Sequence, residues 1–392
     1  MQTVDVLVVG AGLAGLRTAR LLAQRNLDVL VVDRRRSLAS GIRTTGIFVR
    51  RTLDDFDLPG HLLGPGIRDV LLYPPSRRSP IRLTSDRDEY RVADMAGIYR
   101  HEHRAAETAG ARVLLGVRYT GSTREPRRRP AGARGADARL PRTLVHLDGA
   151  EPVRARFLVG ADGARSAVAR DLGLDVNRHL LVGAELLHPI ATGTTTPAFH
   201  CVLDPRYAPG YLGWVIDDGH HAHVGIAGYP HAMRAGLRPL LESFAATAPG
   251  LAAPTGPIER RGGPIPVGGV LRRLACPTGL LVGDAAGAVS PLTAGGLDPC
   301  CRMSAWAAAI TLAYLRTGDE TILRRYDGRA LRRRFRGRLL LRRTFAALGS
   351  PAATEAAVAL LRTPPGRALA ARVLFGDGSF PTLDVRQASP AL

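Results

Sequence analysis

Apolar side chains along the first third of the chain follow two alternating periods. Residues 4–9 form a continuous β-branched run, which predicts a strand buried on both faces, and a glycine-rich turn follows it. Residues 13–25 then carry apolar positions at helical spacing, and residues 28–32 form a second buried run. The order strand, helix, strand is typical of a βαβ unit. We therefore expect an α/β fold with a Rossmann-like sheet.

The pattern changes to strands and turns between residues 180 and 265. Runs at 199–203, 211–216 and 222–227 predict strands, and Asp218–Gly219 between the last two predicts a hairpin. A buried-strand pattern returns at 280–282, and the chain beyond residue 300 is mostly helical in pattern. We expect a dinucleotide-binding domain (1–75, 96–175 and 271–320), interrupted by a β-rich substrate domain (76–95 and 176–270) and followed by C-terminal helices (321–392).

One segment has low complexity. Residues 121–142 are mostly Arg, Pro, Gly and Ala, with strand patterns on either side at 113–119 and 143–147, which predicts a mobile loop between strands. The segment has no interleaved aromatic residues on which bases could stack, so we expect no nucleic-acid partner.

The basic residues are all arginine. Among 392 residues, 54 are Lys or Arg and 34 are acidic, which gives a net charge of +20, and the sequence contains no lysine. The absence of lysine excludes Schiff-base enzymes and phosphate-binding loops of the Walker type. The four cysteines form no C-x-x-C pair, and the sequence shows neither a leader pattern nor an apolar stretch of the roughly 18 to 20 residues that span a bilayer. We expect a reduced, cytoplasmic protein without a metal site.

The glycine turn carries the first chemical signal. Gly10-Ala11-Gly12-Leu13-Ala14-Gly15 follows a strand and opens a helix, and Asp33 ends the next strand, with Arg34 beside it. Such glycines allow a tight turn and close approach to a pyrophosphate, which binds at the helix N-terminus. Asp33 is expected to accept hydrogen bonds from ribose hydroxyls. The motif therefore predicts a dinucleotide site.

Two further strand-and-turn segments indicate which dinucleotide binds. Asp162-Gly163 follows a strand at 157–159, and Gly283-Asp284 follows the strand at 280–282. Three widely separated segments suit a long cofactor, and a carboxylate such as Asp284 suits ribitol hydroxyls, which FAD has and NAD lacks. The three segments resemble those of glutathione-reductase-type flavoproteins of the para-hydroxybenzoate hydroxylase fold. This resemblance implies FAD, with Asp284 on the ribitol and Asp162 and Arg165 near the pyrophosphate and the nicotinamide entry path.

Other segments resemble one branch of that fold, the geranylgeranyl reductases. Residues 289–297 resemble its P-x-T-G-G-G-I segment, residues 211–216 its Y-x-W-x-F-P strand, residues 262–266 its G-G-x-I-P and residues 42–46 its R-x-x-G turn. The resemblance implies further cofactor contacts from Arg43, Gly295, Gly296 and Leu297, and from an arginine that either Arg100 or Arg91 matches. Ala294 and Asp217 depart from that pattern, and Gly287 stands where aromatic hydroxylases usually carry His. Flavin-dependent halogenases need a lysine, which is absent here.

The remaining candidates have a structural alternative each. Tyr211 is a weak candidate proton donor, and Trp214 either belongs to the core or lines the cavity above the flavin. His220, His221 and His223 indicate a solvated turn more than a metal site, and Cys301 a buried thiol. Residues 323–345, rich in Arg with interspersed Leu and Phe, predict either a packed helix with a solvated basic face or a helix that contacts a membrane or an acidic carrier protein.

These features predict an FAD-dependent oxidoreductase that takes electrons from NADPH or NADH. We expect it to reduce or dehydrogenate a carbon–carbon bond in a bulky apolar or carrier-bound substrate, in lipid or secondary-metabolite biosynthesis. The alternatives are a flavin monooxygenase on such a substrate, a non-redox flavoprotein cyclase, and a flavin-binding partner protein without catalysis.

Overall fold

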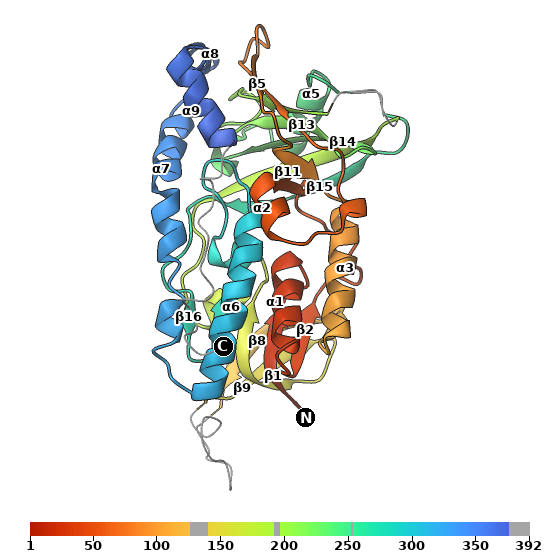
Figure 1. Ribbon diagram of the computed structural model, residues 1–392, viewed down its shortest axis with the longest axis vertical. Helices are drawn as coiled ribbons and strands as arrows, with labels where there is room; N and C mark the ends of the chain where they lie inside the picture. Colours follow the sequence, from red (N-terminus) through yellow and green to blue (C-terminus); the bar gives the residue numbers. More distant parts are fainter. Residues whose placement is uncertain (126–139, 192–196, 252–253, 376–392) are drawn as a thin grey trace.

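The computed structural model describes residues 1–125, 140–191, 197–251 and 254–375. Two sheets lie at opposite ends of an elongated molecule, and long helices run beside them (Figure 1). The larger sheet has the order β16–β17–β10–β1–β2–β7, and β9 and β8 extend it from β10. The second sheet has seven strands, and β3 (Ile47–Val49) pairs with β6 (Tyr90–Val92) in a small ribbon between the two.

The larger sheet is built around β1, which has a parallel neighbour on each side. β1 (Gln2–Val9) lies between β10 (Val153–Gly160) and β2 (Val29–Asp33), while β17 (Gly279–Leu281) and β7 (Arg112–Leu115) extend the parallel set. The buried β-branched runs fill its interior, and α1 (Leu13–Ala23) packs between α3 (Met95–Thr108) and α6 (Leu297–Thr317). The Rossmann-like prediction is confirmed.

The seven-stranded sheet forms the second layer and is mostly antiparallel. Its order is β15 (Glu259–Pro266), β11 (Leu180–Pro189), β14 (His221–Gly228), β13 (Gly213–Asp217), β12 (Ala198–Val202), β4 (Asp69–Tyr73) and β5 (Ile81–Thr84). α5 (Leu237–Ala245) covers one face through Leu241 and the fully buried Phe244. The other face is turned toward the first domain, which makes it the roof of any site between the two.

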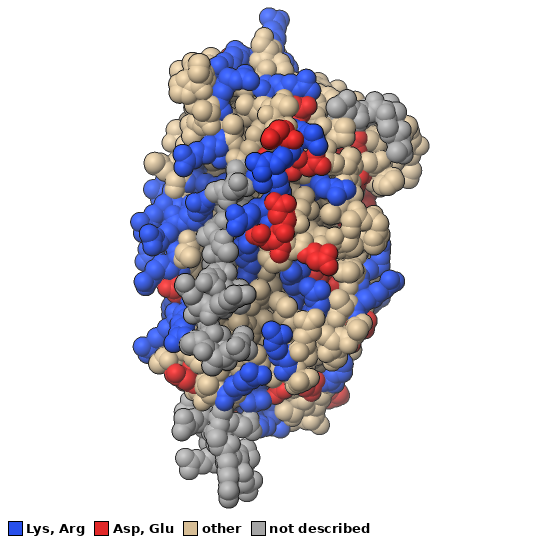
Figure 2. All heavy atoms as spheres, viewed as in Figure 1, with Lys and Arg blue, Asp and Glu red and all other residues tan. Residues whose placement is uncertain are grey.

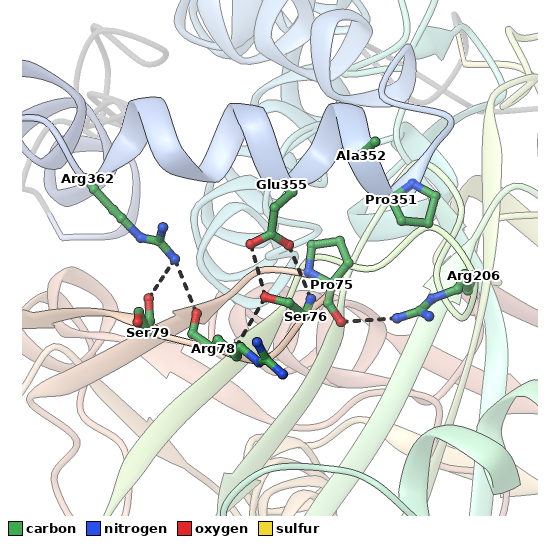
Figure 3. Close-up of a pocket in the computed structure, with 9 residues that line it drawn as sticks. All are labelled: Pro75, Ser76, Arg78, Ser79, Arg206, Pro351, Ala352, Glu355 and Arg362. Carbon is green, nitrogen blue, oxygen red and sulfur yellow. Dashed lines mark hydrogen bonds between the residues drawn. The ribbon is translucent and has the colours of Figure 1, made fainter.

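Three helices follow α6 along one side of the molecule. They are α7 (Arg329–Ala346), α8 (Pro351–Leu361) and α9 (Pro364–Leu374). α8 lies over the loop after β4, where Glu355 accepts hydrogen bonds from Ser76 and Arg362 donates to the carbonyls of Arg78 and Ser79 (Figure 3). A shallow pocket lies between them. These contacts fix the C-terminal helices to the substrate domain.

The remaining elements are short, and two boundaries differ from the sequence prediction. They are α2 (Arg50–Asp55), α4 (Ala167–Asp171), β16 (Ala275–Cys276), and 3-10 turns at 60–62, 230–232, 283–286 and 323–325. β4 joins the second sheet although it precedes residue 76. Residues 121–124 are not loop: they end β8 (Arg118–Arg124), whose backbone pairs with β9 (Thr143–Asp148) past a bulge at Gly121. Residues 126–139 of the expected loop lie outside the described residues.

Candidate FAD-binding site

The three motif segments meet at the carboxyl ends of β1, β10 and β17, which are neighbours in the sheet. Gly10 has a φ of 109°, and a Cβ there would lie 2.4 Å from the carbonyl oxygen of Ala161. A Cβ on Gly283 would lie 2.8 Å from the Cβ of Ala14. The glycine turn therefore touches both other segments, and only glycine allows these approaches. The carboxyl end of a parallel sheet is where such folds bind dinucleotides.

Gly12 leaves open space at the start of α1. A Cβ on Gly12 would meet nothing within 4 Å, whereas one on Gly15 would lie 1.8 Å from the carbonyl oxygen of Gly10. Gly12 is the N-cap of α1, and no side chain caps the helix. The first amides, including those of Leu13, Ala14 and Gly15, thus face this space without intrahelical partners. The arrangement fits a pyrophosphate.

Asp33 lies next to this turn at the end of β2, held by a partner that the sequence interpretation missed. Its carboxylate accepts hydrogen bonds from the amide of Ala11 (2.7 Å) and from the side chain of Arg35 (3.1 and 3.0 Å). Burial alone would raise the pKa of Asp33, but the bonds and charge of Arg35 and the Ala11 amide lower it below its ordinary value. Arg34 is exposed instead. Which of three consecutive arginines turns inward is not visible in the sequence.

Asp162 has a structural task in this arrangement. It accepts hydrogen bonds from the hydroxyl of Ser166 (2.6 Å) and the amide of Ala167 (2.6 Å) at the start of α4. Its carboxylate is therefore committed to the helix, and the backbone of 161–163 is what faces the glycine turn. Arg165 is exposed. Gly163 has a φ of 85°, so the turn requires glycine there.

The carboxylate of Asp284 is placed to bind a ligand that carries hydroxyl groups. Its carboxylate makes no hydrogen bond within the described part of the chain, and burial raises its pKa to about 6. A buried carboxylate without partners is costly. It lies beside the start of α6, since a Cβ on Gly296 would be 3.5 Å from Oδ1 of Asp284. Ribitol hydroxyls would supply the missing donors.

The turn at 290–296 leads into α6 and carries a strained residue. Ala294, which replaces a glycine of the geranylgeranyl reductase pattern, has a φ of 53°. The turn is closed by bonds from the amide of Ser290 to the carbonyl of Gly295 and from the amide of Ala294 to the carbonyl of Ser290. The first-turn amides of the helix from Gly296 and Leu297 onward face the Asp284 side. Such amides could meet an electron-rich flavin edge.

Arg338 holds this turn from α7. Its guanidinium donates hydrogen bonds to the hydroxyls of Ser290 (2.6 Å) and Thr293 (3.3 Å). Burial lowers the pKa of Arg338. A cation thus stands behind the segment that faces the cofactor site.

We expect the Arg338→Met variant to bind FAD about tenfold more weakly, because it loses two charged hydrogen bonds that order the turn. Quenching of flavin fluorescence on titration measures the affinity. Arg336→Met, at an exposed position of the same helix, is the control and should bind like the wild type. Equal weakening in both variants would show that Arg338 has no specific part.

Arg43 and Arg100, the other expected cofactor contacts, differ in setting. The side chain of Arg43 lies over Gly263 of β15, with its Cδ 3.0 Å from a Cβ built there, at the border between the two domains. Arg100 is exposed on α3 and forms a 3.6 Å ion pair with Asp94. Arg43 is exposed too, but it belongs to the turn that follows β2 and its side chain lies against β15. Gly287 has a φ of 70°, and a Cβ there would be 2.6 Å from the Gly269 carbonyl oxygen, so no histidine fits.

Comparisons with known proteins agree with this geometry. A profile described as FAD dependent oxidoreductase matches residues 5–52, and one described as FAD binding domain matches residues 104–196. The digeranylgeranylglycerophospholipid reductase 1 of Methanopyrus kandleri is 28% identical over 346 residues, which cover 83% of this chain and 85% of that protein. The chain is an FAD-dependent oxidoreductase, homologous to the digeranylgeranylglycerophospholipid reductases.

Other relatives place the oxidoreductase in a wider group. The menaquinone reductase of Mycobacterium tuberculosis is 28% identical over 322 residues, covering 76% of this chain and 74% of that protein. A geranylgeranyl bacteriochlorophyll reductase-like structure from Thermoplasma acidophilum superposes with a TM-score of 0.79 at 22% identity, covering 99% and 98% of the two chains. A probable FAD-dependent monooxygenase from Pseudomonas aeruginosa gives 0.62 at 18% identity, covering 90% and 97%. These superpositions confirm the fold.

The roof over the 290–296 turn is apolar and aromatic. Trp214, Leu212 and Ala294 pack against one cluster with Tyr211, and Trp214 also packs against a second one around Cys201. The indole lies across Gly225, where a Cβ would be 2.1 Å away. Trp214 is thus part of the core and of the face that looks toward the first domain.

Cys301 is the buried thiol that was predicted, whereas Tyr211 and His223 have other surroundings than expected. The hydroxyl of Tyr211 donates to the carbonyl of Thr293 (2.7 Å), and burial raises its pKa, so its proton is held. Cys301 is fully buried and its pKa is raised to about 12, as a structural thiol should be. The solvated turn is wrong for His223, which is buried on β14 beside Asp218 and Glu185. Because side chains alternate between the two faces of a strand, the side chain of His223 points into the protein. His220, in the hairpin before the strand, is exposed.

Proposed function

We propose that this oxidoreductase reduces carbon–carbon double bonds in a bulky apolar substrate, with NADPH or NADH as the electron donor. The bound FAD would supply the hydride chemistry. The observation that carries the proposal is the roof: an aromatic and aliphatic sheet face, including Trp214, Leu212 and Leu181, faces the turn that would hold the flavin. Such a surface binds hydrocarbon, and the curated relatives named above are reductases of lipids.

The chain's own residues would do three things around the bound dinucleotide. The amides at Gly12 would bind the pyrophosphate, Asp284 would hold the ribitol, and Arg338 would order the turn at the flavin. The apolar roof would exclude water and orient the substrate over the flavin. FAD as the cofactor is supported by the family profiles, while the donor and the contact residues are part of the proposal.

Anaerobic turnover tests this function. Purified holoenzyme is mixed under argon with NADPH or NADH and with digeranylgeranylglycerophospholipid in detergent. The masses of the lipid products are then measured by mass spectrometry. The proposal predicts a gain of two hydrogens per double bond and matching consumption of the nicotinamide. Turnover that needs oxygen and adds an oxygen atom would indicate a monooxygenase instead. An isomerised product without nicotinamide consumption would indicate a cyclase.

We also propose that the enzyme works in the cytoplasm and meets its substrate at an anionic membrane surface. Across the described residues, no helix is both long enough and apolar enough to cross a bilayer. α7 packs through Leu331, Phe335 and Arg342, and its exposed arginines gather along one side of the molecule (Figure 2); they are Arg329, Arg333, Arg334, Arg336 and Arg343. Leu340 and Leu360 stand 66% and 70% exposed on α7 and α8. Arginines around exposed leucines suit a lipid headgroup layer.

Vesicle sedimentation measures this contact. We expect the enzyme to bind vesicles rich in phosphatidylglycerol and to release from them in high salt. Changing Arg333, Arg334 and Arg336 together to Gln should weaken binding at least tenfold, because each surface arginine contributes about 1 kcal/mol. Sedimentation that is the same for this variant, or for neutral vesicles, would refute the contact, and binding to an acidic carrier protein instead would identify the other expected partner.

A further inference from the structure

A row of buried polar groups runs through the roof of the site. His221 and Asp218 lie at the β13–β14 hairpin, His223 lies on β14 and Glu185 lies on β11, the strand that pairs with β14. The side chain of His221 is 41% exposed and that of Asp218 13%, whereas those of His223 and Glu185 are only 2% and 5% exposed. The row therefore connects the surface to the interior.

Consecutive members of the row lie 3.0 to 3.7 Å apart. His221 Nδ1 is 3.5 Å and His223 Nε2 is 3.0 Å from the same oxygen of Asp218, Oδ2. His223 Nδ1 is 3.7 Å from Oε2 of Glu185, a gap that a small rotation of either side chain would close to hydrogen-bonding distance. Oε2 also accepts a 2.6 Å hydrogen bond from the hydroxyl of Thr45.

The inner end of the row has an acceptor that the protein leaves unused. Among the described residues, Oε1 of Glu185 is buried without a hydrogen-bond partner, and so are Nδ1 of His223 and the indole nitrogen of Trp214. Glu185 and Trp214 flank Gly225 in register on neighbouring strands, and the indole lies across that glycine toward Glu185. Buried polar atoms without partners are rare and point to a missing ligand.

The row ends where the cofactor site and the roof meet. Thr45 belongs to the turn after β2 that includes Arg43, whose side chain lies over Gly263 of β15. Burial raises the pKa of Tyr99 to about 12, and among the charges acting on it are Asp284 and Arg261. Arg261 also acts on Glu185 from β15, so Glu185 and Tyr99 lie within reach of the same charge.

We propose that His221, Asp218, His223 and Glu185 form a proton path from solvent to the substrate, with Oε1 of Glu185 as its last atom. This inference rests on the proposed reduction of a carbon–carbon double bond. One carbon receives a hydride with both electrons, which the bound cofactor supplies, and the other carbon receives the H⁺ of the His223 imidazolium, which passes through the Glu185 carboxyl. His223 is then reprotonated from solvent through Asp218 and His221. Thr45 is the positioning residue of the Glu185 carboxyl.

The charges that face His223 keep its proton available. Burial opposes the charged ring, but Asp218, from the hairpin, and Glu185, from β11, raise the pKa of His223 to about 9. Despite burial, His223 and the amides of His220 and His221 lower the pKa of Asp218 to about 2. The pKa of Glu185 is lowered by His223, Thr45 and Arg261 against the effect of burial. At neutral pH the imidazolium therefore stores a proton next to Glu185.

The test separates the two halves of the reaction. Holoenzyme is reduced with dithionite and mixed under argon with digeranylgeranylglycerophospholipid, and recovery of flavin absorbance is followed by stopped flow. We expect Glu185→Gln and His223→Asn to slow this recovery by 10²–10⁴-fold, the usual contribution of a general acid. FAD affinity and reduction by dithionite should stay unchanged. His220→Asn, on the same hairpin with an exposed side chain, is the control and should react like the wild type.

A second readout is independent of turnover. In ¹⁵N-histidine-labelled holoenzyme, the His223 signal should remain that of an imidazolium up to a pH of about 9, and Glu185→Gln should lower this midpoint. If Glu185→Gln does not fold or does not bind FAD, Thr45→Val takes its place in the stopped-flow test. This variant keeps every charge, and it should slow the recovery of flavin absorbance about tenfold with the FAD affinity unchanged.

The outcomes distinguish the two claims. If flavin absorbance recovers in the wild type and recovers slowly in Glu185→Gln and His223→Asn, the result supports the proton path. If it recovers as fast in these variants as in the wild type, or if the His223 ring is neutral at pH 7, the proton path is overturned and the reductase function stands. Absence of recovery in the wild type itself overturns the proposed function, and the path falls with it.

Discussion

Gly12→Val is expected to abolish FAD binding while leaving the fold intact. The open space beside Gly12 is where the valine side chain would project, between the cofactor and the first amides of α1. The backbone of Gly12, with φ −79° and ψ −179°, is one that valine adopts without strain, and no atom lies within 4 Å of the new Cβ. Loss of the amide contacts should weaken FAD binding at least 100-fold, about 3 kcal/mol.

Calorimetric titration with FAD measures this affinity, and thermal unfolding of the FAD-free protein checks the fold. Gly60→Val is the matched control, because it too meets nothing within 4 Å and lies in an exposed turn. It should bind FAD like the wild type. Gly12→Val protein that still binds FAD with native affinity would show that the pyrophosphate does not lie at this turn.

Asp284→Asn is expected to act in opposite directions on FAD binding and on the stability of the FAD-free protein. Loss of charged hydrogen bonds to ribitol hydroxyls should weaken FAD binding at least 100-fold. The same change removes a half-buried carboxylate without protein partners in the described chain, so the FAD-free variant should be more stable at pH 7 by about 1–3 kcal/mol. An opposite pair of effects is typical of a functional group rather than a structural one.

The gain in stability depends on pH in a direction that the raised pKa fixes. Asp284 has a pKa of about 6 in the folded protein against an ordinary value of 3.8. Between these values the folded state holds a proton that the unfolded chain releases, so the wild type loses stability as pH rises from about 4 to about 6. Urea unfolding of both FAD-free proteins should give equal stabilities near pH 4 and a widening difference up to pH 6. Asp86→Asn, at a largely exposed side chain, should show no such difference; a constant gap at all pH values would contradict the account.

The parts of the candidate site that are formed by residues close together in the sequence could be predicted. Gly10, Gly12 and Gly15 occur in a fixed spacing between a strand and a helix, so their conformations follow from the motif itself. The convergence of Gly12 and Gly283 was also predictable, because parallel strands end at the same edge of a sheet. The alternation of Leu212, Trp214 and Ile216 likewise placed them on one face.

Pairings between distant strands could not be predicted in the same way. Glu185 and His223 are neighbours only because β11 pairs with β14 in one register, and a shift of one residue would turn the histidine away. Arginine-rich segments posed the same difficulty, since nothing local distinguishes Arg338, which faces the 290–296 turn, from the exposed Arg336. Strand β8 was missed at 121–124 because glycine and arginine obscure a strand whose stability comes from pairing with β9.

A crystal structure of the complex with FAD tests the central claim most directly. The account predicts one FAD per chain, with its ribose near Asp33, its pyrophosphate at the amides beside Gly12, its ribitol on Asp284 and its flavin against the turn at Gly295 and Gly296. FAD that contacts only one of these segments, or that binds on the far side of the sheet, would contradict it.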